Sequence, residues 1–336
     1  MPGVSPLWDL EWVLASGSIE RLAGHSAGAV VVTGAGGFIG SHVVQAYLAE
    51  GRPVIGIDRH PLRGNPRDAG YVHYCEELPS ARLTGIFERH QPALVVHAAG
   101  PASVHDSLAD SMGDFGDSVP PVIDVLEAIR ETGKVARFVF LSSAAVYGEP
   151  NRLPIGEQAP ISPLSPYGWH KAMGELAVRE YAAVFGLRTS LLRVFSAYGA
   201  GLRRQVMWDI CQMALDRPIV DLSGSGEESR DFVHVRDVVT AIDAVLRRAP
   251  LAGECYNVAS GESTSIGDLA RWLVSALKVS AEIRFSQEPR RGDPSQWQAD
   301  ITALRGLGYS PSVSVEEGVA EYARWVKETL MSGIES

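Results

Sequence analysis

The sequence of 336 residues contains little cysteine and no cluster of cysteines. Cys75, Cys211 and Cys255 are odd in number and lack the spacing of metal ligands, so we expect neither a disulfide framework nor a metal site. Scattered single cysteines are typical of proteins in a reducing compartment. The sequence therefore predicts a cytoplasmic protein.

Long apolar runs and basic runs are also missing. No apolar stretch approaches the length that crosses a bilayer, and the N-terminus lacks the basic start, apolar core and cleavage site of a signal peptide. The net charge is −10 at pH 7 and no basic run occurs, which argues against a nucleic-acid surface. We therefore expect a protein that binds neither membrane nor nucleic acid.

The most informative pattern that is present lies in residues 29–58. An apolar strand over 29–32 leads into a glycine-rich turn, a helical pattern, a second apolar strand over 53–57 and then Asp58. This order of strand, glycine turn, helix, strand and acid is that of a dinucleotide-binding unit. With an apolar content of 46%, the chain can bury a large core around such a unit.

Each glycine of the turn has a physical reason. Gly34 allows the sharp turn after the strand, Gly37 lets a pyrophosphate approach the backbone, and Gly40 lets the helix pack closely on the strand. Asp58 lies 18 positions after Gly40, where its carboxylate can accept hydrogen bonds from ribose hydroxyls and repel a 2′-phosphate. NAD is therefore expected rather than NADP. NADP stays open because three basic residues follow directly: Arg59, His60 and Arg63.

A second chemical centre is expected where a strand over 138–141 ends and a later helix begins. Tyr167 and Lys171 are four residues apart and share one face of that helix. A phenol with a pKa near ~10 is a weak base at neutral pH, and a nearby ammonium together with the positive nicotinamide is expected to lower that pKa. Ser143, at the strand end, can hold the substrate oxygen against the phenol. His97, which ends another strand, is interpreted as a structural hydrogen-bonding residue.

These motifs resemble the extended short-chain dehydrogenase/reductase family, in its nucleotide-sugar epimerase/dehydratase branch, which includes the UDP-glucose/galactose 4-epimerases. The resemblance rests on GxxGxxG at 34–40, SSAAVYG at 142–148, YGWHK at 167–171 and RDFVHVRD at 230–237, and it covers about residues 29–330. It implies an α/β fold, with a Rossmann-type doubly wound parallel sheet and a smaller C-terminal α/β substrate-binding lobe.

The resemblance also implies a division of the chain and a set of site residues. We expect an N-terminal extension over 1–28, an NAD-binding domain with the catalytic residues over 29–195, and a mainly substrate-binding lobe over 196–336, some segments of which return to the sheet. The expected catalytic residues are Ser143, Tyr167 and Lys171. The expected cofactor contacts are Gly34, Gly37, Phe38, Ile39, Gly40, Asp58, Arg59, Glu76, Ala98, Ala99, Tyr167 and Lys171. The expected substrate contacts are Ser103, Ser143, Ser196, Arg203, Arg230, Arg290 and Trp297, and no metal is expected.

Several positions depart from the family pattern. Glu76 stands where relatives use an aspartate against the adenine, and Ser118 and Ser196 replace asparagines. Pro120 and Pro121 occupy the family's glycine region, and they predict that a helix restarts there, because proline is tolerated in a first turn but not in mid-helix.

The resemblance favours an NAD-dependent nucleotide-sugar 4-epimerase that oxidises and re-reduces C4 of an NDP-hexose or NDP-uronic acid. Ala144 and Ala145 argue against the family's 4,6-dehydratases, which carry an acidic pair there. The alternatives are an NAD(P)H-dependent NDP-4-keto-sugar reductase and an NDP-uronate decarboxylase. A non-catalytic nucleotide-binding protein would need none of the three catalytic residues. A homodimer is expected through the helices at about 111–132 and 166–185.

Overall fold

The computed structural model of the protein describes residues 28–60, 70–133, 137–288, 292 and 294–331. Nearly all of the expected N-terminal extension lies outside the described residues, and so do Arg63, Arg290 and Arg291. Within the described ranges, no helix combines the length and the apolar character that crossing a membrane requires.

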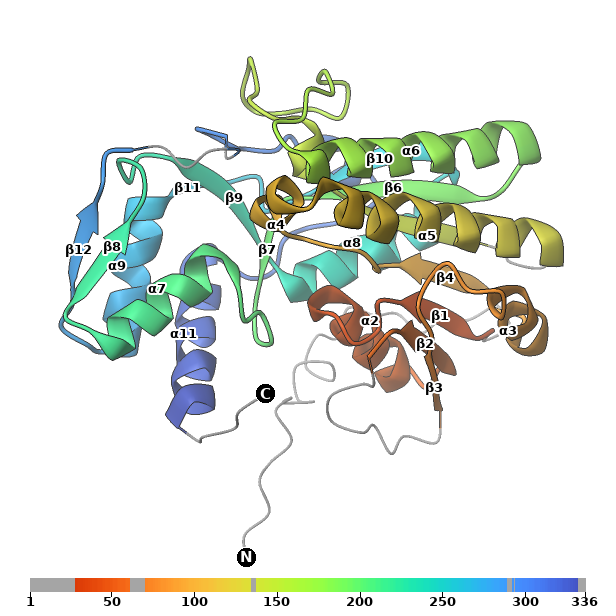
Figure 1. Ribbon diagram of the computed structural model, residues 1–336, viewed down its shortest axis with the longest axis horizontal. Helices are drawn as coiled ribbons and strands as arrows, with labels where there is room; N and C mark the ends of the chain where they lie inside the picture. Colours follow the sequence, from red (N-terminus) through yellow and green to blue (C-terminus); the bar gives the residue numbers. More distant parts are fainter. Residues whose placement is uncertain (1–27, 61–69, 134–136, 289–291, 293, 332–336) are drawn as a thin grey trace, which may run out of the picture.

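A seven-stranded parallel sheet forms the centre of the molecule (Figure 1). Its order is β10-β6-β5-β4-β1-β2-β3, which confirms the expected doubly wound arrangement. The order reverses between β1 and β4, and ligands of such sheets bind outside the strand ends at this point. The strands are β1 (Val30–Thr33), β2 (Val54–Asp58), β3 (Tyr71–Cys75), β4 (Leu94–His97), β5 (Arg137–Ser143), β6 (Thr189–Val194) and β10 (Ala252–Val258).

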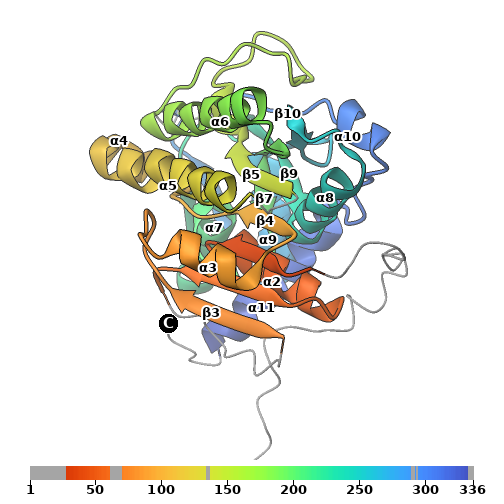
Figure 2. The same ribbon diagram turned by 90° about the vertical axis from the view of Figure 1, so that its right-hand side faces the viewer.

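Helices cover both faces of this sheet (Figure 2). One face carries α2 (Phe38–Ala49) and α8 (Val235–Arg248), and the other carries α3 (Leu83–His90), α5 (Ser111–Thr132) and α6 (Pro166–Phe185). Because the central strands are buried from both sides, they are continuously apolar, as the fully buried residues of β1 illustrate.

A smaller lobe packs beyond the carboxyl ends of the strands (Figure 1). It contains a three-stranded sheet, a two-stranded sheet and three helices around a core of their own. Its elements are β7 (Ser196–Tyr198), β9 (Ser229–His234), β11 (Ser263–Ser265), β8 (Ile219–Leu222), β12 (Glu282–Phe285), α7 (Gln205–Asp216), α9 (Ile266–Leu277) and α11 (Val315–Met331). Two short α-helices, α4 (Val104–Ala109) and α10 (Thr302–Gly306), and a 3₁₀ helix, η1 (Ala144–Val146), complete the elements of the described residues. β10 lies in the large sheet although it follows the lobe's first strands, so the chain returns to the sheet as expected.

The prediction that a helix restarts at Pro120 and Pro121 was wrong, because α5 runs without interruption through both prolines. Each proline removes one backbone N–H from the helix, a loss of about 3 kcal/mol or more for an interior proline. The apolar face of α5, including the fully buried Val122, Val125 and Leu126, packs on the sheet and on α3 and α6. Tertiary packing of this kind supplies most of a helix's stability, and here it outweighs the missing hydrogen bonds.

Candidate active site

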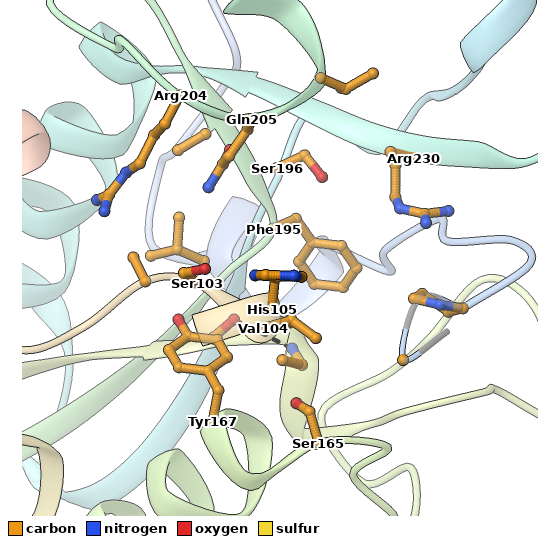
Figure 3. A pocket seen from close by; sticks show the side chains of 18 of the residues that line it. Ser103, Val104, His105, Ser165, Tyr167, Phe195, Ser196, Arg204, Gln205 and Arg230 are labelled. Carbon is orange, nitrogen blue, oxygen red and sulfur yellow. Dashed lines mark hydrogen bonds between the residues drawn. The ribbon is translucent and has the colours of Figure 1, made fainter. Parts of the chain in front are cut away.

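A cavity of about 1200 Å³ lies where the strands of the large sheet end and the lobe begins. It brings together the glycine turn after β1, the end of β5, the first turns of α6 and the inner strand β9 of the lobe. Figure 3 shows side chains of this cavity around one space, with Tyr167 of α6 and Arg230 of β9 on opposite sides of Phe195. A cavity at the reversal of strand order is the position in which open α/β sheets bind their ligands.

The glycine turn is shaped to receive a dinucleotide. Gly34 has a φ of +69°, and a Cβ there would lie 2.6 Å from the backbone nitrogen of Ala99. A Cβ on Gly40 would lie 2.0 Å from the carbonyl oxygen of Gly34. Gly37 precedes the first residue of α2, and Phe38, Ile39 and Gly40 line the cavity beside it. The open backbone and the helix start together offer N–H groups to a pyrophosphate.

Asp58 is held at the end of β2, one strand away from the turn. Its carboxylate accepts hydrogen bonds from the backbone N–H groups of Gly36 at 3.0 Å and His60 at 2.9 Å. Arg59 donates to Asp117 at 2.7 Å and lies 3.7 Å from Glu77, so two carboxylates surround its charge. An acid at this position and a neutralised arginine beside it fit the ribose of NAD and disfavour a 2′-phosphate.

Five expected cofactor contacts are not among the residues that line the cavity, namely Gly34, Asp58, Arg59, Glu76 and Ala99. Glu76 accepts a hydrogen bond from Ser80 Oγ at 3.0 Å and also pairs with Arg82, so both of its carboxylate oxygens are engaged. Ala98 lines the cavity, whereas Ala99 packs under the turn against Gly34.

The three expected catalytic residues meet in the cavity. Ser143 ends β5, accepts a hydrogen bond from the backbone N–H of Ala145 at 3.2 Å and is hydrogen-bonded to Tyr167. Lys171 donates from Nζ to the carbonyl oxygen of Leu141 at 3.2 Å, and its Nζ lies 5.8 Å from the centre of the Tyr167 ring. Tyr167 and Lys171 are therefore on one face of α6, directed at the same strand end.

The electrostatics of this triad differ from the expectation in one respect. Burial raises the pKa of Tyr167, although the hydrogen bond from Ser143 and the charge of Arg204 lower it. Lys171 is buried as well, which lowers its own pKa to about 8, against the opposing charges of Asp114 and Glu175. The expected fall of the Tyr167 pKa is therefore reversed in the chain without cofactor. Burial of the phenolate raises the pKa by more than Ser143 and Arg204 lower it.

A buried acid–histidine pair lies directly behind the triad, and the motifs did not predict it. His170 Nδ1 and Asp114 Oδ2 are 2.5 Å apart between α6 and α5, with both side chains less than a tenth exposed. Asp114 Oδ1 has no hydrogen-bond partner among the described residues. The negative charge of Asp114 raises the pKa of both Tyr167 and Lys171. No short-range signal could have found this pair, since its members are 56 residues apart.

His97 has the structural role that was expected of it. Its Nδ1 lies 2.8 Å from Thr33 Oγ1, which joins the ends of β4 and β1. Burial, with a contribution from the charge of Lys171, lowers the pKa of His97 to about 3. The ring is thus neutral at physiological pH and does not line the cavity.

Most of the expected substrate contacts line the cavity, namely Ser103, Ser143, Ser196, Arg230 and Trp297. The Trp297 indole donates to the carbonyl oxygen of Gly148 at 3.1 Å, and the guanidinium of Arg230 lies 5.6 Å from the centre of its rings. Arg203 instead lies over the ring of Trp325 and does not line the cavity, whereas Arg204 does. Ser118 is buried on α5 and is not part of the lining.

Fold and cavity together define an enzyme of the short-chain dehydrogenase/reductase class, with a dinucleotide turn beside a serine, a tyrosine and a lysine. The model of the NAD dependent epimerase/dehydratase family matches residues 30–259, so the chain belongs to that family. It is 32% identical over 308 residues to a UDP-glucose 4-epimerase of Mycolicibacterium smegmatis. That alignment covers 87% of this chain and 96% of the relative. It is 30% identical over 307 residues to a putative UDP-glucose 4-epimerase of Methanocaldococcus jannaschii, covering 89% and 98%.

Solved structures give the same assignment. A UDP-glucose 4-epimerase of Thermotoga maritima with UDP-glucose superposes with a TM-score of 0.84 at 29% identity, covering 90% of this chain and 99% of that one. A UDP-glucuronic acid 4-epimerase of Bacillus cereus, in complex with UDP-glucuronic acid and NAD, gives a TM-score of 0.83 at 28% identity, covering 89% and 99%. NAD is therefore the cofactor of this family of structures, in agreement with the turn and Asp58.

Proposed function

We propose that this enzyme is an NAD-dependent nucleotide-sugar 4-epimerase. The observation that carries the proposal is the single cavity in which Ser143, Tyr167 and Lys171 meet the glycine turn. The relatives and the solved structures named above are described as UDP-sugar 4-epimerases, one of them as putative, and each is covered by this chain almost from end to end.

Each of the residues at the site has a separate role in the proposed reaction. The turn from Gly34 to Gly40, with Asp58, holds NAD, which when bound accepts a hydride from the sugar and returns it. Tyr167 takes the proton of the C4 hydroxyl and gives it back, while Ser143 holds the C4 oxygen by a hydrogen bond. Lys171 supplies positive charge beside the phenol. Inversion follows when the 4-keto sugar turns and presents its other face to the same groups.

The end of β5 disfavours the dehydratase reaction of the same family. Ala144 and Ala145 follow Ser143 directly, and both are buried. A 4,6-dehydratase must remove a proton and protonate a leaving hydroxyl, and a methyl side chain can do neither. Re-reduction at C4 is therefore the outcome that these residues support.

We also propose a division of labour and a dimer. Residues 29–195 would bind the cofactor and residues 196–336 mainly the substrate, because the lobe contributes Ser196, Arg230 and Trp297 to the cavity. The outer face of α5 and α6 exposes Met112, Trp169, Met173 and Leu176, an apolar surface that fits a second copy of the chain. Light scattering of a Leu176→Glu variant tests this, since the proposal predicts a shift from dimer to monomer.

Release of the bound nucleotide and a mutant assay test the reaction. Mass spectrometry of the denatured protein is expected to find NAD in a stoichiometric amount. Wild-type protein without added cofactor is expected to interconvert a UDP-hexose or UDP-hexuronate with its C4 epimer, and Tyr167→Phe is expected to lower kcat about 10²- to 10⁴-fold. Tyr74→Phe is the control, because that phenol hydrogen-bonds His90 away from the cavity. An empty site with turnover only on added NADPH would replace the epimerase with the 4-keto-sugar reductase.

A further inference from the structure

Two arginines line the cavity from different sides. Arg230, on β9, lies over the rings of Trp297. Arg204 precedes the first residue of α7. Figure 3 shows Arg204 and Gln205 reaching down on the side of Ser103 and Tyr167, with Arg230 across the cavity beyond Phe195. The two cations therefore serve different parts of whatever ligand fills the space.

Arg204 belongs to the end of the cavity that contains the reacting phenol. Its charge acts on Tyr167 and on Asp106, which also lines the cavity. Arg204 is exposed to the cavity and forms no ion pair with any described residue. Arg204, which forms no ion pair with a described carboxylate although its charge acts on Asp106, is thus placed on the side of the cavity that contains Tyr167.

The chemistry of the sugar decides what such a cation can bind. An NDP-hexose offers only neutral hydroxyl groups around C4, and its charge lies in the diphosphate on the other side of the ring. An NDP-hexuronate carries a carboxylate on C5, the neighbour of C4. A guanidinium donates two parallel hydrogen bonds to a carboxylate, a geometry that a neutral hydroxyl cannot match.

Gln205 adds a second polar group at the same place. It is the first residue of α7 and has a φ of +68°, a conformation that non-glycine residues seldom adopt. Its side chain lines the cavity beside that of Arg204. Such backbone strain is typical of positions where a side chain is held for binding.

We propose that Arg204, assisted by Gln205, binds the C6 carboxylate of the substrate, so that the enzyme acts on NDP-hexuronates in preference to NDP-hexoses. This inference rests on the proposed function and specifies its substrate class. Arg230 then remains for the diphosphate. Arg204 would be a specificity-determining residue, since it contacts a group next to the reacting carbon and not the reacting atoms.

Binding measurements test the proposal without requiring turnover. Calorimetry would compare UDP, UDP-glucose and UDP-glucuronic acid on the wild-type protein and on Arg204→Gln, Arg204→Lys and Arg203→Gln. We expect wild type to favour UDP-glucuronic acid over UDP-glucose. Arg204→Gln is expected to lower that preference about 10- to 100-fold, as loss of hydrogen bonds to a charged group implies, and Arg204→Lys to restore part of it. Arg203→Gln, which removes the same charge from a side chain lying on Trp325, should leave the preference unchanged.

Three results would overturn the inference. An equal loss of affinity for all three ligands in Arg204→Gln would place Arg204 at the diphosphate. A fall in the amount of NAD that copurifies with this variant would place it at the cofactor. A wild-type preference for UDP-glucose would show that the enzyme does not recognise a carboxylate at C6. If the proteins bind UDP-glucuronic acid as expected but form no C4 epimer, the proposed reaction fails while the carboxylate site stands.

Discussion

Glu175 offers the sharpest test of what holds α6 against the sheet next to Lys171. It lies one turn after Lys171 on α6, and its side chain is 1% exposed. One carboxylate oxygen accepts hydrogen bonds from Ser142 at 2.7 Å and from Arg193 Nε at 2.8 Å, and the other accepts from Arg193 Nη2 at 2.7 Å. Arg193 is equally buried. This pair joins α6 to β5 and β6, one helical turn from Lys171.

The substitution Glu175→Gln keeps the shape of the side chain and removes its charge. Breaking a buried ion pair from one side costs about 3–5 kcal/mol, because the remaining charge is left uncompensated. We expect the low end, about 3 kcal/mol, since Arg193 keeps its hydrogen bonds to the Tyr147 hydroxyl at 2.9 Å and the Glu157 carbonyl at 3.0 Å. For a chain of this length the unfolding entropy is about 0.7 kcal/mol per kelvin, so Tm should fall by about 4 °C.

Differential scanning calorimetry measures this change, with Glu180→Gln as the matched control. Glu180 is on the same helix, carries the same charge and is exposed, so its substitution should leave Tm unaltered. A Glu175→Gln variant that melts within 1 °C of both the control and the wild type would refute the claim that the pair is a net stabiliser of this site.

Three further predictions follow from the same structure. Asp114→Asn should move the pH–kcat profile toward acid, because Asp114 raises the pKa of Tyr167 and Lys171; Glu131→Gln, on the same helix, should not. The pKa of His97 falls from 6.5 to about 3 on folding, so the unfolded state binds more protons between these values. Because of this residue, the free energy of unfolding should therefore fall by about 1.4 kcal/mol per pH unit below pH 6.5. Denaturant titrations at several pH values should show that this free energy depends less steeply on pH in His97→Gln. Gly40→Ala should purify without NAD, because its Cβ would meet the Gly34 carbonyl at 2.0 Å, whereas Gly85→Ala, with nothing within 4 Å, should retain it.

The sequence predicted those parts of the fold that depend on short-range patterns of residues. The strands coincide with apolar runs: the strand expected over 53–57 is β2 (Val54–Asp58), and the strand expected over 138–141 lies within β5 (Arg137–Ser143). Glycine positions in the turn are equally local, because the steric requirement lies in a backbone approach at each residue. Tyr167 and Lys171 share a face through helix geometry alone.

What the sequence could not predict depends on packing between distant segments. The two prolines of α5 are accommodated because the helix is buried against its neighbours, which no window around residue 120 reveals. The choice between Arg203 and Arg204 depends on the extended backbone of Arg204, with φ −162° and ψ 176°, just before α7 begins. One residue of difference there sends one side chain to Trp325 and the other to the cavity.

The reversed pKa of Tyr167 has a consequence for how the site works. Burial outweighs the hydrogen bond from Ser143 and the charge of Arg204, so the chain alone keeps the phenol protonated at neutral pH. Lys171 does not reverse this, although its pKa of about 8 leaves it mostly protonated at neutral pH. Oxidised NAD, if held by the glycine turn, would add a positive charge and so lower the pKa of Tyr167. In the proposed mechanism, Tyr167 is therefore a stronger base when oxidised NAD is bound than when it is absent, which links proton removal to the state in which hydride can leave.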